Sequence, residues 1–215
     1  MSLRCLGSAF VAMATILSSA SAQPLENTRS LPAFEQWLDR EPARRASFAA
    51  FEAFLAANEV GDVVPAFELW RTATSAERCG ADAFVVPERA HWDNVVPTLR
   101  FVRDFVEPTI GQVEVASAYR NEQLNACAGG SPGSAHRRYY ALDLVPLDSA
   151  VTREALIHDL CRVHANAGAA HHVGLGFYTR TRFHVDTMRF RRWGADGRAA
   201  SSPCLVEDRG DAPRN

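Results

Sequence analysis

The chain has 215 residues, a formal net charge of −2 at pH 7 and 47% hydrophobic residues. A near-neutral chain is not built to bind nucleic acid through bulk positive charge, so we expect no nucleic-acid partner. The length is sufficient for one domain with a substantial hydrophobic core.

Residues 1–22 have the pattern of a secretory signal peptide. Arg4 supplies a positive start, residues 5–17 form an apolar run, and the small triplet at 20–22 (Ala-Ser-Ala) forms the exit. This order predicts cleavage after Ala22. The alternative is a membrane anchor, but the apolar run is shorter than the roughly 20 residues that a spanning helix needs. We therefore expect a periplasmic or secreted monomer without a membrane span after cleavage.

Cysteine usage agrees with export. Four cysteines remain after the predicted cleavage: Cys79, Cys127, Cys161 and Cys204. An even number in an exported chain favours two disulfides, for which three connectivities are possible. A cysteine zinc site is the alternative, but the chain contains no C-x-x-C pair. Any metal must then be held by histidine and carboxylate side chains.

Helical patterns dominate the chain after the predicted signal. Apolar residues recur at helical spacing between residues 31 and 71, with a break at Gly61-Asp62. A clearer helix begins at about Asp93. It is predicted to end at Glu107-Pro108, because proline disfavours helical backbone in the residue before it.

Strand patterns follow this helix. Val113 and Val115 alternate with polar neighbours, which predicts a strand that runs into Ser117. Further strands are predicted at 140–145, about 173–178 and about 182–187, with a helix over 156–163 between them. Helices first and strands afterwards indicate an α+β fold, with a small antiparallel sheet and flanking helices preceded by a helical N-terminal segment.

The chain is predicted to divide into four segments. Residues 1–22 are the signal peptide, and residues 23–90 form a helical N-terminal extension packed on the core. Residues 91–200 form the main domain, and residues 201–215 are a polar tail.

Two histidines and one aspartate on or beside the predicted strands suit a metal site. His136 precedes the 140–145 strand, Asp143 lies within it, and His184 lies on the last predicted strand. A catalytic zinc site needs three protein ligands and one open position for water. Two imidazoles and one carboxylate meet this need. The alternative is that each is an ordinary packed or surface residue.

The neighbouring sequence adds ordered motifs. Ser117-Ala-Tyr-Arg120 comes first, then Ser134-x-His136-x6-Asp143, and then Phe183-His-Val-Asp186. In this order, over about residues 113–193, the motifs resemble the zinc D-Ala-D-Ala carboxypeptidase family. That family includes murein endopeptidases and shares its fold with the hedgehog signalling domain. Its hallmark is S-x-H-x-x-G-x-A-x-D, followed later by a histidine in a motif such as H-V-D.

The resemblance implies a site and a substrate. One Zn²⁺ per chain would be held by His136, Asp143 and His184, and the substrate would be the peptide stems of peptidoglycan. Arg120 would take part in catalysis by binding a substrate carboxylate or carbonyl, a task that suits a planar guanidinium. Ser134 would orient its loop or form a hydrogen bond near the metal and substrate.

Two positions depart from the family pattern. Tyr139 replaces the hallmark glycine, and Thr181 stands where many relatives carry an acid as general base, three residues before the last histidine. Asp186 is a candidate substitute base, and it is also a candidate partner that orients a ligating imidazole. His171 and His172 are a second possibility for the base, although exposed or structural roles are the simpler interpretation.

The sequence therefore predicts a zinc-dependent peptidase, a carboxypeptidase or an endopeptidase, that acts on peptidoglycan stem peptides. The alternative is a catalytically inactive protein of the same fold that binds peptidoglycan or a partner. A third hypothesis, an exported disulfide-bonded domain without metal, predicts that His136, Asp143 and His184 do not converge in space.

Overall fold

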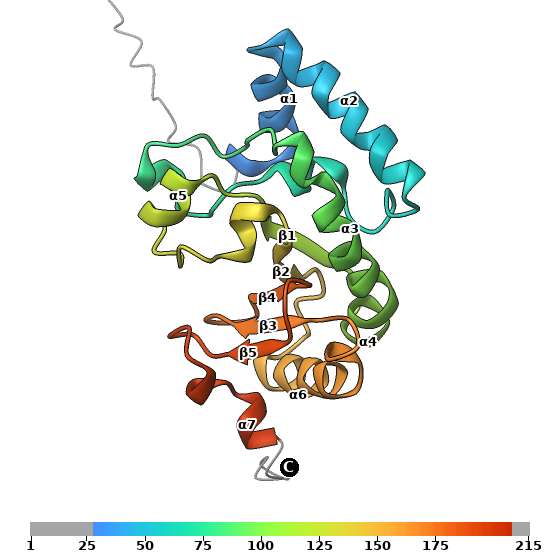
Figure 1. Cartoon of the computed structure of the whole chain (residues 1–215), viewed down its shortest axis with the longest axis vertical. Coiled ribbons are helices and arrows are strands. Elements are labelled where there is room, and N and C mark those ends of the chain that lie inside the picture. The colour runs from blue at the N-terminus through green and yellow to red at the C-terminus, as the bar shows by residue number, and fades with distance from the viewer. Residues whose placement is uncertain (1–27, 208–215) are drawn as a thin grey trace, which may run out of the picture.

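The computed structural model describes residues 28–207. The predicted signal peptide and the end of the predicted tail lie outside the described residues. Figure 1 shows α1 and α2 at one end of the molecule, and the sheet beside α3, α4 and α6. Among the helices of residues 28–207, none is both long enough and apolar enough to cross a membrane.

The N-terminal part is helical, as predicted. The helices are α1 (Leu31–Asp39), α2 (Pro42–Ala57) and the short 3₁₀ segments η2 (Ala66–Trp70), η3 (Glu77–Cys79) and η4 (Arg89–His91). Ser30 begins α1 by accepting a hydrogen bond from the N–H of Ala33 at its side chain. The apolar face of α1 is buried, and its Phe34 ring contacts the rings of Phe48 and Phe84.

The helix predicted to end at Glu107-Pro108 is longer than expected. It runs from α3 (Trp92–Phe101) through the π-helical turn η5 (Val102–Val106) into α4 (Glu107–Ile110). Pro108 lies in the first turn of α4, a position that tolerates a missing backbone N–H. The helix ends instead at Gly111, whose φ of 82° breaks the helical path.

The strands form one five-stranded sheet in the order β1-β2-β4-β3-β5. The strands are β1 (Val113–Ser117), β2 (Ala141–Pro146), β3 (Gly174–Phe177), β4 (Phe183–Asp186) and β5 (Arg191–Trp193). Their connections contain α5 (Glu122–Cys127), η6 (Ala135–Arg138), α6 (Arg153–Val163) and η7 (His164–Gly168), and η8 (Ala199–Ser201) and α7 (Cys204–Glu207) follow. The predicted α+β class is confirmed. The sheet is not wholly antiparallel, because the unpredicted strand β5 pairs parallel with β3.

The register of the sheet aligns residues that lie far apart in the sequence. Ser117 on β1 pairs with Asp143 on β2, and Asp143 pairs with His184 on β4. His184 pairs in turn with Gly176 on β3. Side chains of directly paired residues lie on the same face of a sheet. The register therefore brings the carboxylate of Asp143 and the imidazole of His184 together.

One hydrophobic core joins the N-terminal helices to the sheet. It contains Phe34 and Phe51 of the helices together with Leu142 and Phe183 of the strands. Polar contacts support this attachment, because the Glu68 carboxylate accepts a hydrogen bond from the N–H of Val115 on β1 at 2.8 Å. The division at residue 90 stays a prediction.

The structure shows how Tyr139 is accommodated at the position of the hallmark glycine. Its φ is 62°, in the left-handed region where glycine is the favoured residue. The ring is fully buried between the two parts of the molecule and lies 6.2 Å from the ring of Phe51. Its hydroxyl donates to the Leu69 carbonyl at 2.8 Å. Through this ring packing and this hydrogen bond, the tyrosine connects the N-terminal helices to the loop that carries His136.

The two predicted disulfides are present. Cys79 is bonded to Cys127, and Cys161 is bonded to Cys204. The first links η3 to α5, and the second links α6 to α7. Two disulfides suit a protein of an oxidising compartment.

Candidate metal centre

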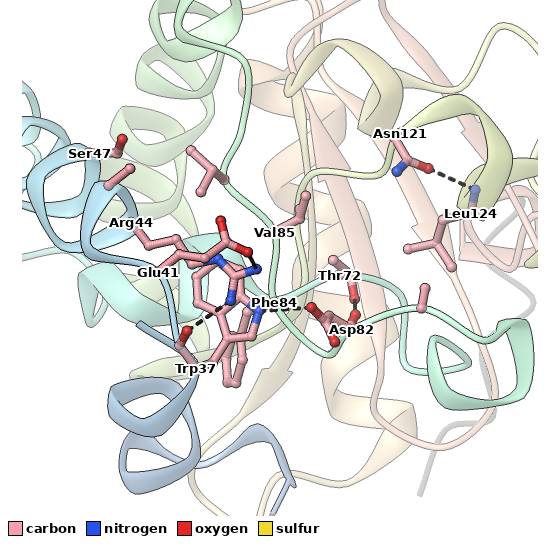
Figure 2. Close-up of a pocket in the computed structure, with 13 residues that line it drawn as sticks. Trp37, Glu41, Arg44, Ser47, Thr72, Asp82, Phe84, Val85, Asn121 and Leu124 are labelled. Carbon is pink, nitrogen blue, oxygen red and sulfur yellow. Dashed lines mark hydrogen bonds and ion pairs between the residues drawn. The ribbon is translucent and has the colours of Figure 1, made fainter. Parts of the chain in front are cut away.

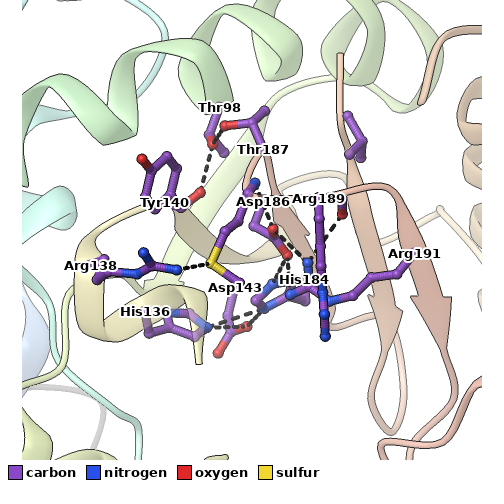
Figure 3. Close-up of polar contacts among 12 residues, drawn as sticks. Thr98, His136, Arg138, Tyr140, Asp143, His184, Asp186, Thr187, Arg189 and Arg191 are labelled. Atoms are coloured by element: carbon purple, nitrogen blue, oxygen red, sulfur yellow. Dashed lines mark hydrogen bonds and ion pairs between the residues drawn. The ribbon is translucent and has the colours of Figure 1, made fainter. Parts of the chain in front are cut away.

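His136, Asp143 and His184 converge in a buried cluster (Figure 3). The Nε2 atom of His136 lies 3.2 Å from Asp143 Oδ1 and 3.2 Å from His184 Nδ1. The distance between His184 Nδ1 and Asp143 Oδ1 is 3.0 Å. Three possible ligand atoms thus form a nearly equilateral triangle. The hypothesis of a domain whose three residues do not converge is wrong.

Hydrogen bonds outside the triangle set the tautomers of both histidines. His136 Nδ1 lies 2.5 Å from the carbonyl oxygen of Ala118, an acceptor, so Nδ1 carries the proton. His184 Nε2 lies 2.9 Å from the carboxylate of Asp186 and is protonated for the same reason. In the neutral rings, His136 Nε2 and His184 Nδ1 therefore carry lone pairs.

The donor set fits a metal ion. Two nitrogen lone pairs and one carboxylate oxygen face one another, an arrangement that is repulsive unless a cation lies between them. Zinc bonds of about 2.0–2.1 Å place neighbouring ligand atoms of a tetrahedron about 3.3 Å apart. The edges of the triangle, 3.0 to 3.2 Å, come close to this value.

Burial and charge prepare these groups to act as ligands. Burial, helped by the positive charge of Arg120, lowers the pKa of His136 to about 4, so the ring is neutral at pH 7. Burial alone would raise the pKa of Asp143. The neighbouring imidazoles of His136 and His184 and the Arg120 guanidinium hold that pKa well below its usual range, so the carboxylate is ionised.

The pKa of His184 shifts in the opposite direction to that of His136. Burial would lower its pKa, but hydrogen bonds to Asp143 and Asp186 outweigh burial and raise it. A ligating histidine must lose its extra proton when the metal binds. Asp186 therefore fixes the orientation of the His184 ring, and it would make this ring a more basic ligand for a metal ion.

A sequence model of the Peptidase M15 family matches residues 70–186. This match covers more than half of the chain and includes all three converging residues. The chain belongs to the Peptidase M15 family. Membership implies a metallopeptidase, and the His136-Asp143-His184 group can hold its metal ion. No curated protein and no solved structure matches the chain.

The Peptidase M15 match begins inside the predicted extension 23–90. Its first residue, Trp70, lies in the fully buried core, next to the segment that contacts β1. The helical extension therefore shares residues with the part of the chain that the family model describes.

Arg120 lies beside the triangle of possible ligands in this Peptidase M15 chain. Its Nη2 atom donates to Asp143 Oδ2 at 2.5 Å, and its Nε atom donates to Ser117 Oγ at 3.0 Å. The residue is only 7% exposed. In this structure Arg120 therefore holds the carboxylate of Asp143, a possible metal ligand, and substrate binding by Arg120 stays a prediction.

Two further polar residues contact Asp143 and were missed by the sequence interpretation. The hydroxyl of Tyr178 donates to Asp143 Oδ1 at 3.0 Å, and Arg182 Nη2 donates to Oδ2 at 2.5 Å. Both flank the turn between β3 and β4, beside the Phe183-His-Val-Asp186 motif, and neither was given a role from the sequence. Their position near the H-V-D motif could have indicated that they lie close to the site. The sequence alone could not show which way these side chains point.

Asp186 contacts the outer nitrogen of His184. Its carboxylate accepts from His184 Nε2, the ring nitrogen that points away from the triangle, and is paired with Arg191 at 2.8 Å (Figure 3). Burial would raise the pKa of Asp186, but the hydrogen bond from His184 and the charge of Arg191 lower it. A base at this place would have to leave both partners, so the geometry favours the orienting role over the general-base role.

The other candidate residues lie apart from the triangle. Ser134 lines a separate hollow together with His91 and Tyr119, and none of the hydrogen bonds found among residues 28–207 joins its hydroxyl to the metal group. His171 and His172 are exposed, and the His171 ring packs 5.0 Å from that of Phe105. The interpretation of these two histidines as exposed residues agrees with the structure.

A larger hollow of about 480 Å³ lies between the N-terminal helices and the loop before α3 (Figure 2). Trp37, Arg44 and Asp82 line it, and the indole N–H of Trp37 donates to Asp82 at 3.0 Å. None of the three possible metal ligands lines this hollow. Arg44 donates to Glu41 and to the Trp37 carbonyl, so these polar side chains are bonded to one another or to the backbone, and we assign the chemistry to the buried triangle.

Proposed function

We propose that this protein is an exported zinc peptidase that hydrolyses peptide bonds in peptidoglycan stem peptides in the periplasm. The observation that carries the proposal is the meeting of two imidazole lone pairs and one carboxylate oxygen within 3.2 Å of one another. Membership of the Peptidase M15 family and the two disulfides support the same proposal.

His136, Asp143 and His184 would hold the zinc ion. Two neutral imidazoles and one carboxylate leave a bound Zn²⁺ with one net positive charge. When bound, zinc supplies a water of lowered pKa and polarises a carbonyl oxygen. The chain itself keeps both histidines in the required tautomers through Ala118 and Asp186.

Asp143 is kept in place by donors on both of its oxygens. Tyr178 donates to Oδ1, and Arg120 donates to Oδ2. A buried carboxylate with such donors stays ionised and cannot rotate freely. These contacts pre-organise the ligand set, which is the contribution that a rigid scaffold makes to a metal site.

A second candidate function is a binding protein of the same fold without turnover. The observation that favours it is Thr181, which offers no carboxylate at the position where relatives carry a base. Among the described residues, Asp143 and Asp186 are the carboxylates in contact with the histidines of the group, and both are already engaged.

Digestion of purified peptidoglycan distinguishes the two candidates. Zinc-loaded mature protein is incubated with sacculi and with isolated muropeptides, and the products are identified by mass spectrometry. A peptidase releases terminal D-alanine or converts cross-linked dimers into monomers. The His184→Ala variant and the chelated wild type should release neither. Binding to sacculi without any product, by a fully zinc-loaded sample, would instead support the binding protein.

A further inference from the structure

Two guanidinium groups hold the same oxygen of Asp143 but differ in their access to solvent. Arg120 and Arg182 each donate to Oδ2 at 2.5 Å. The side chain of Arg120 is 9% exposed, whereas that of Arg182 is 26% exposed. Arg120 is one of the groups that hold the pKa of Asp143 low, whereas Arg182 is the one of the two arginines that solvent reaches more readily.

The environment of Arg182 fixes its position at the surface of the site. Its guanidinium lies 4.7 Å over the ring of Tyr178, and its Nη1 atom donates to Thr74 Oγ1 at 3.0 Å. Arg153 braces the turn that carries both residues by donating to the carbonyls of Tyr178 and Arg180. Stacking and bracing reduce the conformational freedom that Arg182 would lose on binding a ligand.

Arg182 also has unused hydrogen-bonding capacity. Its Nε atom is buried and has no hydrogen-bond partner within residues 28–207. Its neighbour Thr74 lines a hollow of about 740 Å³ between α1 and the segment before α3. This hollow thus reaches Thr74, the residue to which Arg182 Nη1 donates.

Arg29, Arg71 and Arg120 lie near Arg182, and the carboxylates of Asp143 and Glu114 neutralise part of their positive charge. Arg29 is held nearby by hydrogen bonds to the carbonyls of Thr72 and Ala116. Burial together with the positive charges of Arg71 and Arg182 lowers the pKa of Arg29 to about 10. The positive charge that these carboxylates do not neutralise attracts an anion.

We propose that Arg182 binds a carboxylate of the peptide substrate close to the scissile bond, and that Arg120 serves as the positioning residue of Asp143. This inference rests on the proposed function. A planar guanidinium binds a carboxylate through two parallel hydrogen bonds, one to each oxygen. A substrate in which the carboxylate is amidated cannot form both of these bonds. Arg182 therefore determines specificity for anionic stem peptides.

Two carboxylates of a stem peptide are possible partners: the C-terminal one and the side-chain one of diaminopimelate. The experiment uses three synthetic peptides, one with both carboxylates free and two in which one or the other is amidated. For each, kcat/KM and Kd are measured with the zinc-loaded mature wild type and with Arg182→Gln, Arg182→Lys and Arg162→Gln. Arg162 lies on the exposed face of α6 and controls for the loss of one positive charge.

The wild type and Arg162→Gln should prefer the free peptide over one of the amidated peptides by about ten- to a hundredfold, as expected for a hydrogen bond between charged groups. Arg182→Gln should lose most of this preference, and Arg182→Lys should keep part of it. The amidated position that removes the preference identifies the carboxylate. Arg120→Gln should instead weaken zinc binding, measured by competition with a chelator.

The outcomes separate this inference from the proposed function. If the wild type cleaves all three peptides equally, or if Arg182→Gln keeps the full preference, the inference is wrong and the peptidase stands. If the wild type binds the free peptide through Arg182 without cleaving it, the inference stands and the peptidase fails. If no peptide is bound or cleaved by the zinc-loaded protein, both are wrong.

Discussion

The Nε2 atom of His136 lies 3.2 Å from the Nδ1 atom of His184, and each nitrogen presents a lone pair when its ring is neutral. Asp143 Oδ1 completes the triangle at 3.2 and 3.0 Å from the two nitrogens. The Ala118 carbonyl and the Asp186 carboxylate enforce this arrangement from outside. The outer hydrogen bonds thus orient three buried polar residues as a group that can hold a metal ion.

The first prediction concerns Asp186. The negative charge of Asp186 orients His184 and raises the basicity of its ring. The Asp186→Asn variant removes this charge, so zinc affinity should fall about ten- to a hundredfold. Competition with a chromophoric chelator measures the change. Asp159→Asn, which removes a carboxylate from the surface of α6, is the matched control. Equal zinc affinity in the two variants would contradict the orienting role.

The second prediction concerns removal of the metal. A ligand that binds the folded state alone stabilises it by about 2.7 kcal/mol when its free concentration is 100 times its Kd. Chelation should therefore lower the Tm of the wild type, and added zinc should restore it. The His184→Ala variant should show no such zinc-dependent shift. A wild-type Tm that is the same with and without bound zinc would count against coupling between the site and the fold.

The third prediction concerns Tyr139. Tyr139→Phe leaves the buried Leu69 carbonyl without its donor, which should cost about 1–3 kcal/mol of unfolding free energy. Tyr139→Gly should cost about 3–5 kcal/mol, because the lost packing of a buried ring exceeds the gain from relieving a left-handed backbone. Urea denaturation measures both. A glycine variant as stable as the wild type would refute the connecting role.

The fourth prediction is a pH dependence that originates at Glu68. Burial raises the pKa of this carboxyl, against the opposing effects of the Val115 N–H and the Arg71 charge. Just above pH 4.5 the folded state then binds more protons than the unfolded state, so the unfolding free energy contributed by Glu68 falls as pH rises. Glu68→Gln lacks this fall and should gain stability relative to the wild type as pH rises toward neutrality.

Urea denaturation at several pH values from about 4.5 to 7 checks the Glu68 prediction, since stability follows the difference in bound protons. Glu154→Gln, which removes an exposed carboxylate at the start of α6, controls for the loss of one negative charge. Wild type and Glu68→Gln with parallel pH profiles would contradict the expected effect of burial.

The sequence was sufficient for the parts of the site that lie in local motifs. His136 and Asp143 are joined by a short segment, and His184 lies in a strand pattern, so their order predicted a common site. Arg182 could not be found in this way, because its contact with Thr74 joins residues 108 positions apart. Side-chain direction at the ends of strands depends on the register, which motifs do not encode.

Local sequence patterns also left parts of the fold unpredicted. Periodicity predicted the longer helices and four strands, but β5 has three residues, Arg191–Trp193, without an alternating pattern. Its place depends on Trp193, which packs over the bare backbone of Gly176 and lies 4.9 Å from the ring of His184. Likewise, the helix continues past Pro108, which follows a π-helical turn and lies in the first turn of α4, and local sequence rules do not anticipate such a turn.

The most direct test of the account is the metal content of the purified, oxidised mature protein. Elemental analysis after zinc loading and dialysis is carried out on the wild type and on His136→Ala. We expect one zinc per chain in the wild type and loss of that zinc in the variant, with both samples folded by circular dichroism. A folded wild type that retains no zinc, or a His136→Ala variant that retains as much as the wild type, would contradict it.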